Sequence, residues 1–279
     1  MESYEARINN AKYALEKADY ILLGAGAGLS AAAGLDYSGK RFTDNFSDYI
    51  EKYGLTDMYT ATFYPFSTPE ERWAHWARHI DVNRFSQSAT PLYMDLLKLA
   101  QCKEYFVITT NVEAQFAKAG FPTEKIFATQ GDYAYLQCAK GCHDKLYYNE
   151  ALIKQMLSET NDCKIPSALV PKCPVCGGPM TVNLRKDDYF VQDDAWYTAH
   201  GRYEAFLKKV ENKRVVFIEL GVGFNTPGII RYPFEQMTYR NEQATLLRLN
   251  RDFPTGEKEN EQKTIAFAED MPRVVTALL

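Results

Sequence analysis

The stretch YILLGAGAGLSAAAGLDYSG, which begins at Tyr20, limits the fold of this chain more than any other. A short apolar run ends in three alternating glycines, Gly24, Gly26 and Gly28, and we expect a helix to begin near Ser30. A buried strand, a glycine turn and a helix in that order are typical of nucleotide-binding units, because glycines let the backbone approach a pyrophosphate. A tight turn without a ligand is the alternative that the stretch leaves open.

Predicted strands and helices alternate along the rest of the chain, which predicts an α/β fold with a doubly wound, parallel, Rossmann-like sheet. We expect strands in EYFVITTN, IFATQGD, RVVFIEL, TLLRLN and TIAFAED. We expect helices at 5–18, within 45–85 (RWAHWARHI), in PLYMDLLKLA, in VEAQFAKAG closed by Gly120, near 195–211 and near 233–242.

One segment differs in residue composition from the rest of the chain. Residues 138–181 hold turn residues, lysines and four cysteines around a single helix near NEALIKQMLSE. We therefore predict a small inserted module there, between residues 1–137 and 182–279 of the nucleotide-binding domain.

A Rossmann dehydrogenase would carry an acidic residue about 20 residues after the glycines, at the end of the next strand. Asp44 and Asp48 lie at about that distance, but within RFTDNFSDYIEKY, which does not have the pattern of a strand. This weakens the hypothesis of hydride transfer.

The charge and hydrophobicity of the chain argue against nucleic acid and membranes as partners. The formal net charge is −4 without a long cationic run, so nucleic acid is not expected as a partner. No apolar run approaches the ~20 residues of a membrane span, and MESYEARINNAKYALEK has the pattern of a charged amphipathic helix rather than a signal peptide. We expect a cytoplasmic protein that binds no membrane.

Four cysteines form two ligand pairs, Cys138 with Cys142 and Cys173 with Cys176. Short Cys-x₂₋₄-Cys turns let each pair reach one tetrahedral Zn²⁺ at Zn–S distances of about 2.3 Å. Four thiolates complete the coordination, so we predict a structural zinc. His143 could replace a ligand, but a solvated side chain is the preferred interpretation.

The other cysteines and two histidines are assigned no function. Cys102 and Cys163 have no partner at ligand spacing. His75 and His79 share a helix face at i, i+4 spacing, but without the glutamate of an HExxH zinc site we expect them to be surface residues.

Two further pieces, TTNVEAQF and ATQGDY, complete a resemblance to the sirtuins, which covers nearly the whole chain. Sirtuins carry GAGxSxxxGIPDFR, TQNxDxLH, an HG dipeptide, a four-cysteine zinc module and late GTS and LIN elements. The matching residues, in the same order, are Gly26 to Ser30 with Gly34, Thr110-Asn111-Val112, Gln130-Gly131, the four cysteines, Gly221-Val222-Gly223 and Leu249-Asn250.

The departures from that pattern are informative. Gln130 replaces the catalytic histidine of deacylating sirtuins, and Glu113 replaces the aspartate that follows their asparagine. The proline of IPDFR is absent from LDYS, and NLRKDDYFVQDD replaces the acyl-lysine clamp. This set resembles the macrodomain-linked (class M) microbial sirtuins. It implies NAD-dependent protein ADP-ribosylation of a lipoylated, glycine-cleavage-H-like carrier protein, with a macrodomain hydrolase as a second partner.

The resemblance also implies roles for individual residues. Asn111, Gln130 and Asp132 would be catalytic, with Glu113 as a second candidate base. Asp132 could instead be a turn-forming carboxylate, and Arg185 and Asp187 could contact the acceptor or belong to a solvated loop. NAD, a consumed co-substrate, would be bound by Gly26, Ala27, Gly28, Ser30, Asp36, Tyr37, Asn111, Gln130, Gly221, Gly223, Asn250 and Asp270.

The substitution at 130 separates three hypotheses. An imidazole with a pKa near ~6.5 can take up the ribose hydroxyl proton that deacylation requires, whereas a glutamine amide can only hydrogen-bond. Cleavage of NAD should therefore survive, and we predict an ADP-ribosyltransferase. A deacylase with another base and a catalytically silent NAD or ADP-ribose sensor are the alternatives.

Overall fold

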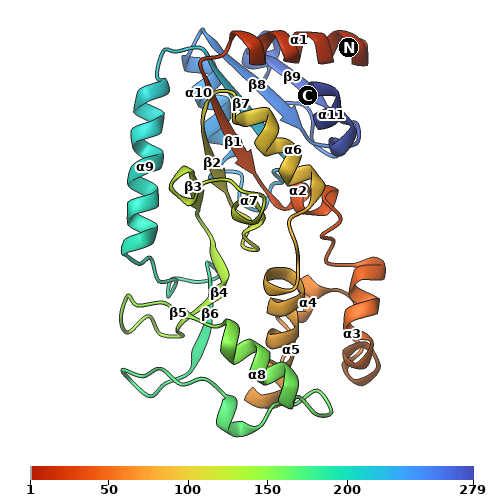
Figure 1. Cartoon of the computed structure of the whole chain (residues 1–279), viewed down its shortest axis with the longest axis vertical. Coiled ribbons are helices and arrows are strands. Elements are labelled where there is room, and N and C mark those ends of the chain that lie inside the picture. Colours follow the sequence, from red (N-terminus) through yellow and green to blue (C-terminus); the bar gives the residue numbers. More distant parts are fainter. Residues whose placement is uncertain (1) are drawn as a thin grey trace.

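The computed structural model describes residues 2–279, which form an upper and a lower lobe (Figure 1). The upper lobe is built on a six-stranded sheet in the order β3-β2-β1-β7-β8-β9, and every pairing in it is parallel. This confirms the predicted fold class. The strands are β1 (Tyr20–Ala25), β2 (Glu104–Thr109), β3 (Ile126–Ala128), β7 (Val215–Leu220), β8 (Ala244–Leu249) and β9 (Thr264–Phe267).

Helices cover both faces of the sheet, because successive side chains of a strand point to opposite faces. Ile21 and Leu23 of β1 pack in one core with α1, α6 and α11, while Leu22 packs in the other with α9 and α10. A strand buried on both faces is a continuous apolar run, which is why the sequence before the glycines has that pattern. These helices are α1 (Tyr4–Lys17), α6 (Pro91–Ala100), α9 (Asp194–Val210), α10 (Arg231–Arg240) and α11 (Met271–Leu278).

Two short helices differ from the predictions. α2 (Ala27–Ala32) begins before Ser30, directly after the turn. α7 is only Gln115–Lys118, shorter than VEAQFAKAG suggests, and begins after Ala114, whose φ is +57°. The side chain of Glu113 bonds to the neighbouring Val112 N–H and to a second segment of the chain, which holds this stretch out of the helix.

The lower lobe contains a three-stranded antiparallel sheet in the order β5-β4-β6. Its α5 packs against α8 in a core that includes Trp73, Trp76, Ile153 and Met180. Residues 39–85 therefore lie with the predicted module 138–181, although they fall within the 1–137 segment. The elements of this lobe are α3 (Gly39–Tyr53), α4 (Met58–Ala61), α5 (Pro69–Ile80), the π-helix η1 (Asp81–Phe85), β4 (Gly131–Cys138), β5 (Tyr147–Tyr148), α8 (Glu150–Glu159) and β6 (Met180–Leu184). Across residues 2–279 the 3₁₀ turns are η2 (Thr123–Lys125), η3 (Ser167–Leu169) and η4 (Lys258–Lys263).

The prediction that His75 and His79 are surface residues is wrong. Both are 0% exposed, because they lie on the face of α5 that packs into aromatic rings. Within residues 2–279 neither ring nitrogen of His75 has a hydrogen-bond partner, and burial lowers its pKa to about 4. Helical spacing predicted the shared face but not its direction.

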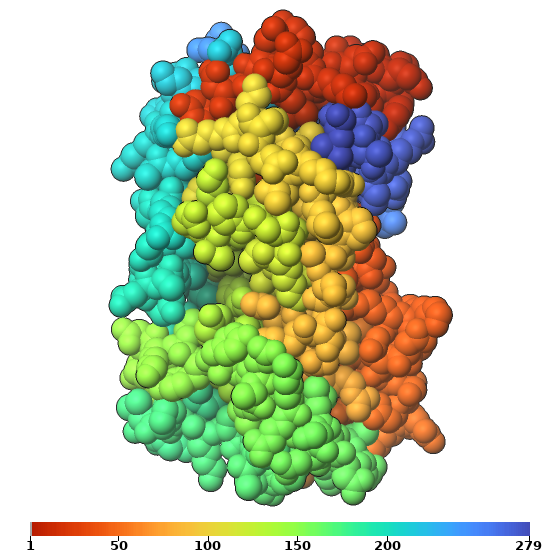
Figure 2. Space-filling model, in the orientation of Figure 1, coloured from red at the N-terminus to blue at the C-terminus, as the bar shows by residue number. Residues whose placement is uncertain are grey.

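The first and last helices, α1 and α11, pack against each other at the end of the upper lobe away from the lower lobe, where red and dark blue meet (Figure 2). Among residues 2–279, no helix is both long enough and apolar enough to span a bilayer.

Candidate functional site

A cavity of about 780 Å³ opens at the carboxyl ends of β1 and β7. The chain runs from β1 outward through β2 and β3, then returns beside β1 with β7 and proceeds outward in the other direction. Such a topological switch point is where open parallel sheets bind their ligands, because the two adjacent loops diverge there.

The glycine turn after β1 packs against a second glycine turn after β7. Gly28 N–H donates to Gly221 O at 2.9 Å, and a Cβ on Gly28 would lie 2.8 Å from the Cα of Gly221. Gly221 has a φ of +60° and equally little space for a side chain. The glycines thus serve first to bring two loops together, and this contact forms the floor of the cavity.

The predicted nucleotide-binding residues gather at this cavity. Ser30 and Tyr37 lie outside its lining: Ser30 is buried beneath it, and the Tyr37 hydroxyl pairs with that of Tyr133 at 2.8 Å. The predicted residues that line it are Gly26, Ala27, Gly28, Asp36, Asn111, Gln130, Gly221, Gly223, Asn250 and Asp270.

Asn111 is held in one orientation by three acceptors. Its Nδ2 donates to Gly26 O at 3.0 Å, to Ser30 Oγ at 3.0 Å and to Tyr93 OH at 3.2 Å. Because a main-chain carbonyl can only accept, the nitrogen of the amide must be the atom that faces Gly26. The amide oxygen of Asn111 is therefore the atom offered to a ligand in the cavity.

Glu113 lies behind Asn111 and supports it. Its Oε1 accepts from Ser30 Oγ at 2.5 Å and from Tyr93 OH at 3.3 Å, and its Oε2 accepts from Val112 N at 3.0 Å. The residue is only 6% exposed and outside the cavity lining. The carboxylate fixes the two hydroxyls that hold Asn111, so its position suits it to support Asn111 rather than to act as a base.

Gln130 lies at the junction of the two lobes. Its carbonyl accepts from Arg185 N at 3.0 Å, and its Nε2 lies 3.3 Å from Thr129 Oγ1. Gly131 follows with a φ of +100°, and any Cβ there would overlap Asn183 O. The main chain on both sides of Gln130 is thus tightly defined, which aims the side chain into the cavity.

Asp132 is engaged in structural contacts outside the cavity lining. Its Oδ1 accepts from Arg84 Nε at 2.8 Å and from Ala134 N at 2.7 Å, and its Oδ2 accepts from Arg84 Nη2 at 3.2 Å. Both carboxylate oxygens are thus occupied by donors from a distant segment and from the neighbouring main chain. Asp132 links β4 to the π-helix η1.

The segment in place of the acyl-lysine clamp divides in two. Arg185 lines the cavity, with its guanidinium 4.5 Å from the ring centre of Phe190 and 5.8 Å from that of Trp196. Asp187 is exposed and accepts from Tyr189 N at 3.0 Å, closing a turn. Arg185 is therefore the residue of this pair that can meet a substrate.

Several residues that line the cavity were not predicted, because no motif in the sequence marks them. Tyr133 lies on β4 and reaches the cavity from the lower lobe, while Glu269 is held by an ion pair with Arg7 of α1. An irregular loop after β8 supplies three more, and in the sequence these are marked only by their position directly after Leu249-Asn250. The missed residues include Tyr133, Arg251, Asp252, Phe253 and Glu269.

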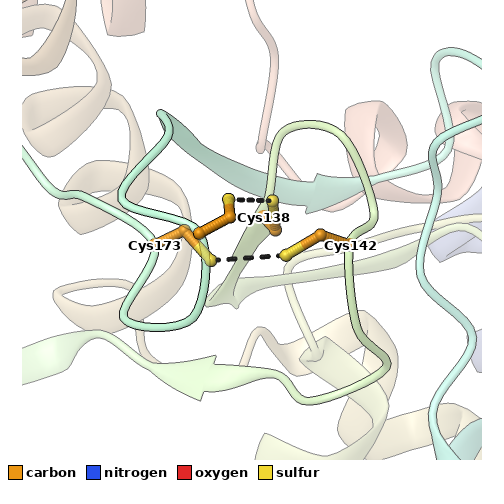
Figure 3. Close-up of side chains that lie close together, drawn as sticks. Cys138, Cys142 and Cys173 are labelled. Carbon is orange, nitrogen blue, oxygen red and sulfur yellow. Dashed lines mark hydrogen bonds between the residues drawn. The ribbon is translucent and has the colours of Figure 1, made fainter.

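The four paired cysteines converge from two loops of the lower lobe (Figure 3). Their sulfurs all lie within 4.8 Å of one another, with Cys138 and Cys176 at 3.7 Å and Cys142 and Cys173 at 3.6 Å. Four sulfurs bound to one tetrahedral Zn²⁺ at about 2.3 Å would be about 3.8 Å apart. The cluster therefore fits a structural zinc, as predicted.

His143 is half-buried beside this cluster rather than fully solvated. Its Nδ1 lies 3.1 Å from Cys142 Sγ and its Nε2 lies 2.9 Å from Tyr147 OH. A ring that bonds a ligand sulfur and a tyrosine on β5 orients that ligand, as outer partners of metal sites commonly do.

Comparisons with known proteins agree with this geometry. The Sir2 family model matches residues 26–214. A protein ADP-ribosyltransferase of Staphylococcus aureus is 37% identical over 267 residues, 95% of this chain and 85% of that protein. A probable bifunctional ADP-ribose hydrolase/ADP-ribosyltransferase of Fusarium oxysporum f. sp. cubense is 32% identical over 280 residues, although this chain spans only 46% of its length.

Solved structures agree on the fold. A Sir2 homologue in complex with NAD has a TM-score of 0.60 at 15% identity, over 97% of this chain and 91% of that one. A triple mutant of Sir2 homologues in complex with 2'-O-acetyl ADP-ribose has a TM-score of 0.61 at 16% identity, over 96% of this chain and 94% of that one. The match to the family model and the two sequence relatives show that the chain belongs to the Sir2 family.

Proposed function

We propose that this chain is an NAD-dependent protein ADP-ribosyltransferase that releases nicotinamide and modifies a lipoylated carrier protein. The observation that carries the proposal is the contrast between Asn111, oriented toward the cavity, and the two neighbouring carboxylates. Glu113 and Asp132 are both taken up by structural bonds. The relative from Staphylococcus aureus, which carries the name of this activity, supports it.

The reaction divides into cleavage and capture. The bond from ribose C1′ to nicotinamide breaks, and nicotinamide leaves with the electron pair. In this proposal the amide oxygen of Asn111 and the amide of Gln130, which both line the cavity, bind the ribose hydroxyls. An acceptor nucleophile then gives an electron pair to C1′ and loses its proton to solvent.

Deacylation needs one further proton transfer, which Gln130 cannot perform. Its amide donates and accepts hydrogen bonds but takes up no proton near neutral pH. The transferase is therefore the function that this site supports best, and Asn111 gives it an advantage over a silent sensor, which would not need an oriented amide at the reacting ribose.

The acceptor is proposed from the resemblance to the class M sirtuins, with a macrodomain hydrolase as the partner that would remove the modification. Arg185, with its guanidinium stacked on Phe190 at the cavity wall, is positioned to meet the acceptor as it enters. A cation fixed by aromatic rings suits an acidic or carboxylate-bearing acceptor group.

The test is intact-protein mass spectrometry of a lipoylated H-like carrier after incubation with this protein and NAD. The unlipoylated carrier and the Asn111→Ala variant serve as controls. A gain of one ADP-ribose on the lipoylated carrier alone supports the proposal in full. Nicotinamide release without any gain would overturn this acceptor and leave either an NAD hydrolase or a transferase with a different acceptor, and the absence of nicotinamide would favour the sensor.

A further inference from the structure

A cluster of four charged side chains is buried behind the cavity, on β7, β8 and α10. Glu219 and Arg248 are both 0% exposed. Glu219 Oε2 accepts from Arg248 Nε at 2.9 Å and from its Nη2 at 2.8 Å, and Glu219 Oε1 accepts from Arg231 Nη1 at 3.1 Å. Arg248 Nη2 also pairs with Glu235 Oε1 at 2.7 Å. None of the four belongs to a sequence motif that predicts a site residue.

The remaining guanidinium donors hold main-chain carbonyls of one loop. Arg231 donates to Phe253 O at 3.2 Å and to Thr255 O at 2.7 Å, and Arg248 Nη1 donates to Thr255 O at 3.1 Å. This loop, which follows β8, has no helical or strand hydrogen bonds of its own between residues 253 and 256. The Asn250 side chain accepts from Asp252 N and Phe253 N where the loop begins, and the two arginines hold the loop from Phe253 onward through its carbonyls.

The same loop forms one wall of the cavity through Arg251, Asp252 and Phe253. Its next residues must lie close to the charged cluster, because a Cβ on Gly256 would overlap Glu235 Oε1 and Arg248 Nη1. The loop thus fits against the buried charges on one side and faces the ligand space on the other.

Arg231 also joins this loop to the turn after β7. Its guanidinium lies 4.8 Å from the ring centre of Phe224, and that ring meets Phe253 edge to face at 4.9 Å. Phe224 adjoins the cavity-lining residues Gly223 and Asn225. One side chain therefore contacts both loops that diverge at the switch point.

Stability alone gives a poor account of this cluster. Buried ion pairs are often no more stabilising than apolar side chains of the same volume, because removing four charges from water is costly. Guanidiniums do supply several directional donors in a fixed plane, which apolar packing cannot. What the cluster supplies is the position of the loop.

We infer that Arg231 and Arg248 are positioning residues that set the affinity for the dinucleotide by fixing the Arg251–Phe253 wall of the cavity. The inference rests on the proposed function, since it concerns the same cavity. It adds a role for residues that lie outside the cavity lining.

The experiment measures nicotinamide release against NAD concentration for Arg231→Lys. A lysine keeps the charge but has a single point of donation, so it cannot hold Glu219 and both carbonyls. We expect KM for NAD to rise about tenfold while kcat stays within about twofold, because a residue behind the wall acts on binding rather than on bond cleavage. Arg240→Lys, an exposed position on the same helix, should change neither parameter.

A second variant reaches the same loop without altering a charge. Gly256→Ala forces the loop away from Glu235 and Arg248 and should also raise KM selectively. Calorimetric titration of ADP-ribose into each folded variant measures binding directly. Unchanged ADP-ribose affinity in Arg231→Lys and Gly256→Ala, or a fall in kcat equal to the fall in kcat/KM, would overturn the inference.

The two proposals fail differently. If the unaltered protein releases no nicotinamide but binds ADP-ribose, the proposed function fails, and the binding titrations still decide the role of Arg231. If the unaltered protein is active and the variants match it, only the positioning role fails.

Discussion

The two lobes hold together by different means. The upper lobe buries its sheet between two layers of helices, and its cores consist of aliphatic and aromatic side chains. The lower lobe has a three-stranded sheet, a cluster of four cysteines and a core that includes two buried histidines. A sheet covered on both faces buries enough apolar surface to fold by itself, whereas a small module needs a metal to offset the entropy of ordering its loops.

The cavity lies where the two lobes meet. Both lobes therefore supply residues to it, but of different kinds. The upper lobe provides the glycine floor and Asn111, and the lower lobe provides Tyr133 and Arg185. The comparison therefore predicts that chemistry depends on the upper lobe and that access and stability depend on the lower one. Four experiments test this, from the largest effect to the smallest.

Removal of zinc should have the largest effect. Cys173→Ser, or a chelator, should unfold the lower lobe at a cost of about 10 kcal/mol of folding free energy, and activity should be lost with it. Tryptophan fluorescence reports this directly, since Trp73 and Trp76 belong to the lower core. Cys102→Ser, at an exposed thiol outside the cluster, is the control. An unshifted spectrum after zinc loss would contradict the comparison.

The second largest effect is expected from changes to the residues that hold Asn111 in place. Glu113→Gln keeps the size of the side chain but removes its charge, and loosening Asn111 should lower nicotinamide release about 10²-fold. Tyr93→Phe, which removes one acceptor of the Asn111 amide, should lower it less. Glu124→Gln on the surface is the control. Normal nicotinamide release combined with a loss of transfer to the acceptor would identify Glu113 as the base instead.

The buried histidines should make the lower lobe sensitive to acid. Burial lowers the pKa of His75 from 6.5 to about 4. Between these pH values the imidazole is protonated in the unfolded chain and neutral in the folded one. The stability that neutral His75 contributes is fully present above pH 6.5 and is lost as the pH falls toward 4, by about 2 kcal/mol at a pH of about 5.

Urea unfolding near pH 7 and near pH 5 measures this effect, with His75→Phe expected to reduce the difference. His200→Phe, on the upper lobe, should leave the difference unchanged. Because acid also releases zinc from thiolates, the comparison with His75→Phe is the deciding one. An identical pH dependence in both proteins would assign the acid sensitivity to the zinc site alone.

The smallest of the four effects is expected for Gln130→His, measured as deacylase activity. The imidazole restores a base, but the segment 183–194, which differs from the acyl-lysine clamp of deacylating sirtuins, is not expected to hold an acyl-lysine peptide. We expect a slight gain of deacylation, measured as loss of acyl mass from a peptide, with nicotinamide release maintained. Full recovery would show that the lower-lobe segment is irrelevant to this choice.

Local patterns were sufficient for much of the fold. The apolar run before Gly24, the alternation of strands and helices, and the Cys-x₂₋₄-Cys pairs each depend on neighbours in the chain, and the structure contains the elements they predict. The pairing of α5 with α8 could not be predicted, because a helix face carries no mark of its partner. The burial of His75 and His79 has the same kind of cause, because their rings pack against Phe46 and Tyr49 of α3 and Tyr133 of β4, segments distant in the chain.

By itself, the sequence determined the strand and glycine turn, the cysteine cluster and the identity of the residue at 130. Only the tertiary structure decided which carboxylates are free. Folding brings Arg84, 48 positions away in the chain, beside the carboxylate of Asp132, and it brings Ser30 Oγ against the carboxylate of Glu113. The reason is physical: spacing along the chain sets which side chains share an element, whereas a proton acceptor is made or silenced by the charges and donors that folding brings to it from elsewhere.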